Sequence, residues 1–148
     1  MARPEDVDTA VSVRYRVSLD GAELGAFDTC DGLGCEVVVE TREEGGRNDS
    51  VVQMFTRLKY PNIKLSRPLG RDTEQVARLF AAMVNGYTLS GGTIVAMRAD
   101  GKEIARWSLR DVLPIRWTGP SFNPDQPKVL TETVEIAHHG FTAEQVRV

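Results

Sequence analysis

The side chains best suited to acid–base or metal chemistry in this chain are its two histidines, His138 and His139. Because they are adjacent, their rings would point to opposite faces of a strand and could not bind one metal ion together. A general base also needs an acid that orients it. Glu135 lies on the face opposite His138, and Glu132 lies on the same face but six residues away, too far along a strand for contact. We therefore expect one histidine packed against the sheet and one in solvent.

The two cysteines, Cys30 and Cys35, are five positions apart. They could form a disulfide in a secreted protein, whereas two small, half-buried thiols are favoured in a reducing cytoplasm. A zinc site usually needs four ligands, and no histidine lies near this pair in the sequence.

Other groups that could carry chemistry also lack the context they need. Gly32 and Gly34 precede a predicted strand, whereas a phosphate cradle needs glycines that open a helix. Glu43 and Glu44 lie in a polar segment, and a mobile loop is a poor platform for catalysis. The sequence therefore predicts no catalytic residue, no cofactor site and no metal site, and the protein is not expected to be an enzyme.

The elements that would position these groups begin with a strand over residues 11–19, where polar and apolar residues alternate strictly. Its polar face carries Arg14 and Arg16, which could bind a polyanion. No aromatic residues alternate with them to stack bases, so a solvated surface or a subunit salt bridge is favoured. Asp20 and Gly21 predict a tight turn into a returning strand over residues 24–30.

A second Asp-Gly pair, Asp31 and Gly32, is expected to turn the chain into a strand over residues 35–41. Residues 41–50 are polar and include two adjacent glycines, so they cannot bury themselves. We expect them to project from the sheets as a mobile loop, which would suit a contact with another molecule. A short alternating strand with Ile63 and Leu65 on its apolar face follows.

Residues 71–86 predict the one clear helix. Asp72 is expected to cap its first turn, with Gln75 at the reciprocal position of a capping box. Gly86 is expected to end it. The helix carries one apolar stripe with i, i+3, i+4 spacing, formed by Val76, Leu79, Phe80, Met83 and Val84.

The last third of the chain contains both tryptophans. Residues 93–99 and 103–109 flank a third Asp-Gly pair and predict a hairpin. The strand that carries Trp107 is expected to end at Pro114, and Trp107 and Trp117 are both expected to anchor the core, because a buried aromatic side chain contributes about 1.5 to 3 kcal/mol. Residues 130–140 are expected to return as the final strand.

The bulk composition fits one small domain. A chain of 148 residues can bury about two thirds of its unfolded surface without a metal or cofactor. The net charge of -3 gives no global basic field, and no apolar run approaches the length of a membrane span. The polar start is unlike a signal peptide, so we expect a cytoplasmic location, with residues 1–10 flexible. Six to eight short strands and one helix predict a mainly β fold with two packed antiparallel sheets, barrel-like in shape.

The order of several motifs resembles the tail-tube proteins of contractile phage tails, which include inner-tube subunits of contractile injection systems. The motifs are W-S-L-R-D-V-L-P at residues 107–114, G-P at 119–120, E-T-V-E-I-A-H-H-G at 132–140, E-V-V-V-E-T-R-E-E-G-G-R-N at 36–48 and N-I-K-L-S-R at 62–67. The resemblance covers about residues 12 to 140. Two features depart from it: residues 55–61 replace a P-G-R-x-K turn, and Phe80 stands where a tryptophan is frequent.

The resemblance implies six-membered rings that stack into a hollow tube inside a contractile sheath. Its partners would be copies of itself, the sheath protein, baseplate or spike proteins and cargo in the lumen, with no sequence-specific nucleic acid. The long loop would contact the next ring through Arg42, Glu43, Glu44, Gly45, Gly46, Arg47, Asn48, Asp49 and Gln53.

Two alternatives remain open from the sequence. The two departures fit a close relative that starts the tube on the baseplate and forms one ring without polymerising. A protein of another class, a small-molecule-binding barrel of the flavin type, would show cofactor absorbance, but the sequence offers it no phosphate-binding cluster.

Overall fold

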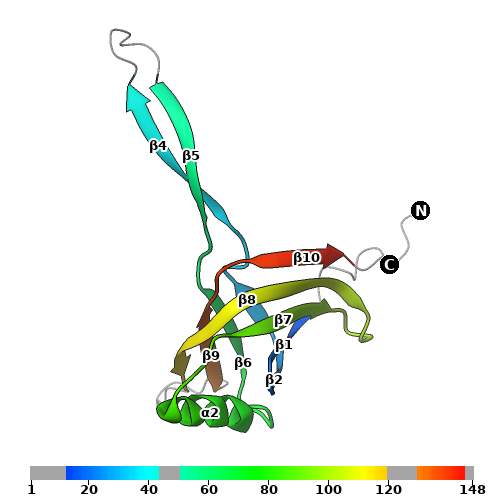
Figure 1. Ribbon diagram of the computed structural model, residues 1–148. Helices are drawn as coiled ribbons and strands as arrows, with labels where there is room; N and C mark the ends of the chain where they lie inside the picture. Colours follow the sequence, from blue (N-terminus) through cyan, green and yellow to red (C-terminus); the bar gives the residue numbers. More distant parts are fainter. Residues whose placement is uncertain (1–12, 44–50, 120–129, 146–148) are drawn as a thin grey trace, which may run out of the picture.

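A long antiparallel sheet and a projecting hairpin make up the computed structural model (Figure 1), which describes residues 13–43, 51–119 and 130–145. Within these residues the elements are β1 (Arg14–Leu19), β2 (Ala22–Phe27), β3 (Thr29–Asp31), β4 (Glu36–Glu43), β5 (Val51–Lys59), β6 (Ile63–Pro68), α2 (Thr73–Ala82), the 3₁₀ turn η1 (Met83–Asn85), β7 (Ser90–Met97), β8 (Glu103–Thr118), β9 (Thr131–Ala137) and β10 (Phe141–Gln145). The prediction of a mainly β fold with one helix and two antiparallel sheets is confirmed. The described strands do not close into a barrel.

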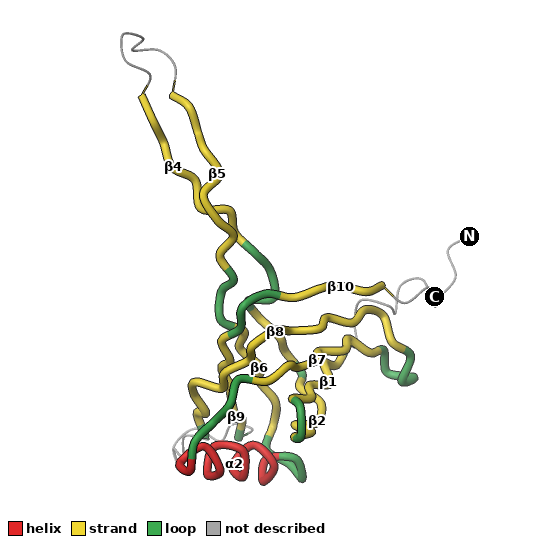
Figure 2. The backbone as a smooth tube through the Cα atoms, viewed as in Figure 1, coloured by secondary structure: helices red, strands yellow, loops and turns green. Residues whose placement is uncertain are grey.

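The main sheet has the strand order β2-β1-β7-β8-β9-β6-β3. Its longest strand, β8, has 16 residues and serves two partners on one side: β10 pairs with residues 105–109 and β9 with residues 113–118. The chain therefore turns a corner between β9 and β10 and keeps following β8 (Figure 2). The expected final strand is thus followed by one more, β10, which the sequence analysis missed.

The core lies between the inner face of this sheet and α2. Strand β1 alternates as predicted, with Val17 and Leu19 buried and Arg14 and Arg16 exposed. Two Asp-Gly pairs form the expected hairpin turns, and their glycines adopt positive φ angles of 82° at Gly21 and 87° at Gly101. The buried apolar cluster is built by Val17, Leu19, Leu24, Phe27, Ile63, Leu65, Val76, Ile94, Leu109, Val112, Val134 and Ile136.

A buried ion pair crosses this core. The Nε of Arg67 on β6 donates a hydrogen bond of 2.7 Å to Oε1 of Glu132 on β9, and both side chains are almost fully enclosed. The same guanidinium donates to the carbonyl of Leu24 on β2 and, at 2.8 Å, to the carbonyl of Asp72 before α2. It also stacks 4.2 Å above the ring of Phe27. The Arg67 guanidinium therefore joins β6 and β9 to the edge strand β2 and to the start of α2.

The helix begins where predicted but is not capped as predicted. The Asp72 side chain makes no capping hydrogen bond, and its carboxylate lies 3.9 Å from Arg67 instead. It also fits against Gly25, where a Cβ atom would lie only 2.4 Å from Oδ2 and φ is +85°. The last residue of the predicted apolar stripe does not pack on the sheet: the helix tightens to a 3₁₀ turn at Met83, the periodicity changes, and Val84 is 86% exposed.

Three expectations for the other elements also need correction. Strand β8 does not end at Pro114 but passes through it, because a register shift beside Pro114 accommodates a residue without an N–H. Trp107 packs against the core as expected, whereas Trp117 is 37% exposed and is not a core anchor. The strand expected over residues 24–30 is divided at Asp28 into β2 and β3.

The buried ion pair gives a prediction for stability. Glu132→Ala leaves the Arg67 cation buried without its carboxylate, so we expect a loss of about 3 to 5 kcal/mol in the free energy of unfolding. Urea denaturation measures it. Glu135→Ala, on the same strand, is the control, because that carboxylate makes only an exposed hydrogen bond with Asn62 and its loss should change little. The apolar double variant Arg67→Met with Glu132→Leu should recover much of the loss. Equal stability of Glu132→Ala and wild type would show that the Arg67–Glu132 pair does not stabilise the fold.

Candidate assembly surface

Strands β4 and β5 leave the body as a two-stranded antiparallel hairpin, here called the arm (Figures 1 and 2). The pairing runs from Glu36 opposite Lys59 at the root to Glu43 opposite Val51 at the end that the structure describes. Every residue of β5 is exposed. An isolated two-stranded hairpin is only marginally stable in water, so the arm is a structure that needs a partner surface.

A bulge organises the arm into two distinct faces. The register shifts between Val38 and Val39, and the hydroxyl of Thr56 donates a hydrogen bond of 2.6 Å to the carbonyl of Val38 at this point. A bulge of this kind increases the local twist of a hairpin. On either side of it the alternation of side chains is kept, so the register assigns each side chain to one face of the arm.

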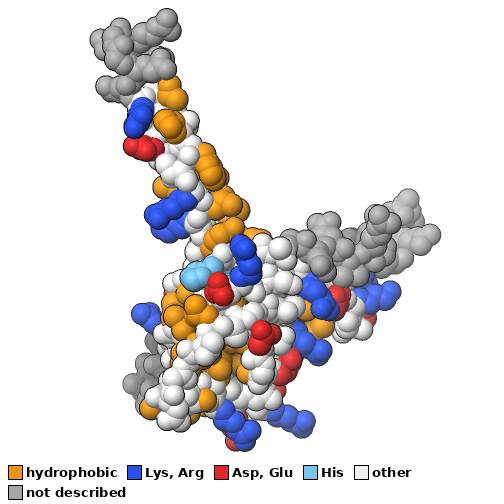
Figure 3. Space-filling model, viewed as in Figure 1, with side chains coloured by type: hydrophobic (Ala, Val, Ile, Leu, Met, Phe, Trp, Pro, Cys, Tyr) orange, Lys and Arg blue, Asp and Glu red, His pale blue; other side chains and the backbone are white. Residues whose placement is uncertain are grey.

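One face is mainly apolar. Val37 lies opposite Leu58 and Val39 lies opposite Phe55 on this face near the root; the polar pair Thr41 and Gln53 follows, and Val51 lies on the same face further out. The exposed fractions of the five apolar side chains run from 44% for Leu58 to 65% for Phe55. Apolar side chains gather along one side of the arm in the space-filling view (Figure 3). Contiguous exposed apolar surface of this kind marks an interaction site in a folded protein.

The other face carries charge, and the two strands differ in sign. On β4 it presents Glu36 and Glu40, and on β5 it presents Arg57 and Lys59. The apolar residues Val38, Val52 and Met54 lie between these charges on the same face. Arg42 is the exception, a cation on β4 near the outer end. One long edge of the arm is thus mainly acidic and the other basic.

The root of the arm rests on an aromatic cluster. Tyr60, the first residue after β5, lies with its ring centroid 5.6 Å from that of His138 and 5.8 Å from that of Phe141. The amide of Gly140 donates a hydrogen bond of 3.1 Å to Nδ1 of His138. A Cβ atom at Gly140 would lie 3.2 Å from the Tyr60 ring, so this corner between β9 and β10 has room only for glycine. The cluster joins the root of the arm to this corner between β9 and β10.

The comparisons with known proteins decide the family. A family model described as "T4-like virus tail tube protein gp19" matches residues 11–142. The chain belongs to this tail tube family. The resemblance found in the sequence is thereby confirmed, and the chain is a structural protein of the tail tube type.

Solved structures share the fold of this tail tube protein. A chain from the cryo-EM structure of the anti-feeding prophage baseplate, sixfold symmetrised, gives a TM-score of 0.76 with 16% identity over 100% of both chains. A chain from the PVC extracellular contractile injection system, in its extended sheath–tube complex, gives 0.75 with 15% identity over 99% of this chain and 100% of that one. Hcp1 from Salmonella typhimurium gives 0.57 with 14% identity over 92% and 88%. A search of curated proteins gave no match.

The residues expected to form an inter-ring contact in this tail tube protein are only partly described. Arg42 and Glu43 end β4 and Gln53 lies in β5, so the arm is strand where a loop was expected to begin. Glu44, Gly45, Gly46, Arg47, Asn48 and Asp49 lie outside the described residues. The apolar face was not recognised from the sequence, although the period of two in Val37 and Val39 was a signal for it.

The two histidines behave as predicted, but their partners differ from the nearest acids in the sequence. His138 is buried in the aromatic cluster, and His139 is exposed with Nδ1 3.2 Å from Oδ2 of Asp111 on β8. Asp111 has a φ of 50°, the only positive φ of a non-glycine residue among those described, and it lies where the pairing of β8 with β7 shifts register between Leu109 and Val112. Glu132 binds Arg67 instead.

The cysteines and Arg14 of the tail tube chain lie on its surface or at the edge of its core. Both cysteines are free; Cys30 is half-buried, and burial raises its pKa to about 11, whereas Cys35 is exposed rather than half-buried as expected. Arg14 lies 3.8 Å from Asp28 on the surface. The described residues contain no group of three potential metal ligands and no helix long and apolar enough to span a membrane.

The aromatic cluster predicts a pH dependence of stability. Burial is the main cause that lowers the pKa of His138 below its ordinary value of 6.5; backbone hydrogen bonds at Gly140 and Pro61 oppose it, and His139 lowers the pKa further. Because the unfolded chain then binds the proton more tightly, stability is full above pH 6.5 and falls as the pH drops through the folded pKa.

Thermal unfolding between pH 7.5 and 5 tests this. His138→Phe keeps the ring contacts but cannot titrate, so its loss of stability on acidification should be smaller than that of wild type. His139→Gln, which removes the exposed imidazole, should keep most of the wild-type slope, because burial, the main cause of the lowered pKa of His138, is unchanged. The same slope in His138→Phe and wild type would refute the role of His138.

Proposed function

We propose that this protein is a subunit of the inner tube of a contractile tail or injection system, in which copies form hexameric rings that stack into a tube with a lumen for cargo. The observation that carries the proposal is the apolar face of the arm, which has core-type residues and nothing to cover it among the described residues. Membership of the tail tube family identifies the expected partner as a second copy of the chain.

Open strand edges support closure into a ring. In the described residues β2 and β3 end the main sheet, and β10 has a hydrogen-bonded partner on one side only. Exposed edges invite pairing with another chain, and a ring of identical subunits satisfies every edge in the same way. The sixfold symmetry of the anti-feeding prophage neighbour supports six copies, and the sheath–tube complex of the PVC neighbour supports a contractile sheath as an outer partner.

The arm would then carry the contact between stacked rings. Its apolar face supplies burial, and its end, with Arg42, Glu43, Gln53 and residues 44–49, supplies charged contacts worth about 0.2 to 1 kcal/mol each. The particle would assemble in the cytoplasm, and its tube would work mechanically as a rigid conduit driven forward by the sheath.

A second candidate is a tube-initiator or spike-adaptor ring in the baseplate. The neighbour from the anti-feeding prophage baseplate favours it. Such a protein would form one ring and would not polymerise alone, so negative-stain microscopy of the purified protein separates the two: stacks and filaments support the tube subunit, and single rings support the initiator. A monodisperse monomer at high concentration would contradict both.

The two faces of the arm provide a matched pair of variants. Phe55→Asp puts a charge on the apolar face, and Met54→Asp puts the same charge on the neighbouring position of the opposite face. Both residues are exposed, so the fold should be kept. We expect Phe55→Asp to abolish higher-order assembly, because an anchor that loses its burial typically costs about 2 kcal/mol or more, and Met54→Asp to retain it. Sedimentation and microscopy measure the effect; equal assembly of both variants would show that the apolar face is not the contact.

A further inference from the structure

The aromatic cluster at the root of the arm joins two parts of the molecule that are held in different ways. The corner between β9 and β10 is fixed to β8 by two backbone hydrogen bonds of 2.9 Å, from the amide of Arg110 to the carbonyl of Gly140 and from the amide of His139 to the carbonyl of Arg110. The arm meets this corner through side chains, with the ring of Tyr60 against that of His138. The His138 ring therefore lies between the fixed corner and the arm.

The hydrogen bond at this ring determines where its proton lies. The Gly140 amide donates to Nδ1 of His138 over 3.1 Å, so Nδ1 is an acceptor and the neutral ring carries its proton on Nε2. In the imidazolium form both ring nitrogens carry a proton, and the Nδ1 proton would face the proton of the Gly140 amide. Because the corner is held to β8, the ring must move, and with it moves the surface on which Tyr60 packs.

The acids near the cluster already have other partners. The titratable or charged groups on the elements that build the cluster and lie next to it along the chain are Lys59, Tyr60, Arg110, Asp111, Glu135 and His139. Asp111 lies 3.2 Å from Nδ1 of His139, and Glu135 accepts a hydrogen bond of 3.2 Å from Asn62. Burial is the main cause that lowers the pKa of His138, and the charge of His139 lowers it further. The folded cluster therefore disfavours the imidazolium form.

We propose that His138 is a pH-sensitive joint of the arm: its protonation breaks the hydrogen bond from Gly140, releases Tyr60 and lets the arm leave its fixed direction. This inference rests on the proposed function and adds a means of regulation to it. The fixed direction is kept above pH 6.5 and is lost as the pH falls through the lowered pKa of His138. An arm without a fixed direction must be ordered when it docks, which costs conformational entropy, so copies of the chain assemble poorly in mildly acidic solution.

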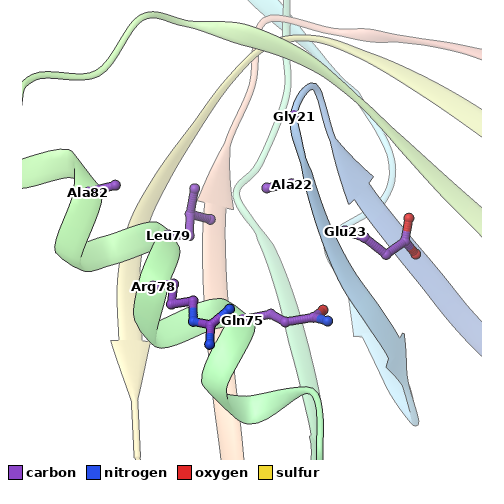
Figure 4. A pocket seen from close by; sticks show the side chains of 7 residues that line it. All are labelled: Gly21, Ala22, Glu23, Gln75, Arg78, Leu79 and Ala82. Carbon is purple, nitrogen blue, oxygen red and sulfur yellow. The ribbon is translucent and has the colours of Figure 1, made fainter.

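Energy transfer between two dyes within single protomers tests the joint apart from assembly, because at picomolar concentration the protomers are separate. One dye is attached to Gln53→Cys on the arm. The other is attached to Gln75→Cys on α2, beside the open groove between this helix and the β1–β2 turn (Figure 4). Cys35→Ser removes the exposed native thiol, and burial raises the pKa of Cys30 to about 11, which makes that thiol a poor nucleophile at the pH of labelling.

We expect a narrow distribution of transfer efficiency at pH 7.5 and a broad one at pH 5.5, because the released arm samples many directions. His138→Phe keeps the ring contacts without a titrating group and should give a narrow distribution at both pH values. His139→Gln, at the neighbouring exposed position, is the matched control and should broaden like the parent protein. The same width at both pH values in the parent protein would overturn the joint. Loss of the circular dichroism of the strands at pH 5.5 would also overturn it, since the body would then respond and not the joint.

Assembly gives a second readout. If about one protomer in ten keeps its arm fixed at pH 5.5, the critical concentration for stacking rises about tenfold relative to pH 7.5, and it falls again when the pH is restored. His138→Phe should change by less than about twofold under the same conditions. Sedimentation and negative-stain microscopy measure both proteins. An equal rise in His138→Phe and wild type would assign the pH dependence to other groups and refute the proposal.

The outcomes separate the two proposals. If wild-type protein assembles at neither pH, the proposed function fails, and the measurement on single protomers still decides whether the joint exists. If wild-type protein assembles equally well at pH 7.5 and 5.5, the function stands and regulation through His138 is refuted.

Discussion

A hairpin of two strands has no second layer against which to bury an apolar face, and the arm of this protein is such a hairpin. In the body, the inner face of the sheet buries Val17 and Leu65 against the residues of α2 and the facing strands. In the arm, Val39 and Phe55 are residues of the same kind at the same kind of strand position, yet both are more than half exposed. Burying each fully would contribute about 1.5 to 3 kcal/mol. The body completes its core within one chain, whereas the arm could gain this free energy only by association with another surface.

An arm can use this free energy well only if its direction is fixed before docking, because ordering a mobile segment on binding costs conformational entropy. The root supplies that fixation. Tyr60 packs on His138 and Phe141, and the chain then passes within three residues into β6. Strand β6 is held by the Arg67–Glu132 pair to β9 and, through the same guanidinium, to the strand and helix on the other side of the core. The buried cation therefore matters beyond stability, since it makes the platform from which the arm projects a rigid one.

Much of the fold could be predicted because local patterns determined it: strict alternation in β1 and β6, Asp-Gly turns with positive φ at glycine, and a helical stripe around Val76. What failed depended on tertiary context. Pro114 is acceptable inside β8 only because a register shift lies beside it, and Asp72 leaves the helix amides for Arg67, a partner that spacing cannot reveal. Likewise the sequence shows Glu132 only as an acid in an alternating strand, because the pairing of β6 with β9 is what places Arg67 opposite it. The family could be inferred from motif order, whereas the apolar face of the arm needed the pairing register, because only the bulge at Val38 places Val39 opposite Phe55.

The division of labour between apolar and charged residues on the arm follows from their energies. Exposed ion pairs contribute little each and are screened by salt, so Glu36, Glu40, Arg57 and Lys59 cannot supply most of the affinity of a tube contact. The apolar face can supply it, but hydrophobic contact is non-directional and would accept the arm in either orientation. The charges do not remove that ambiguity, because Glu36, Glu40, Arg57 and Lys59 lie on the face of the arm opposite Val39 and Phe55 and stay in water when the apolar face is covered.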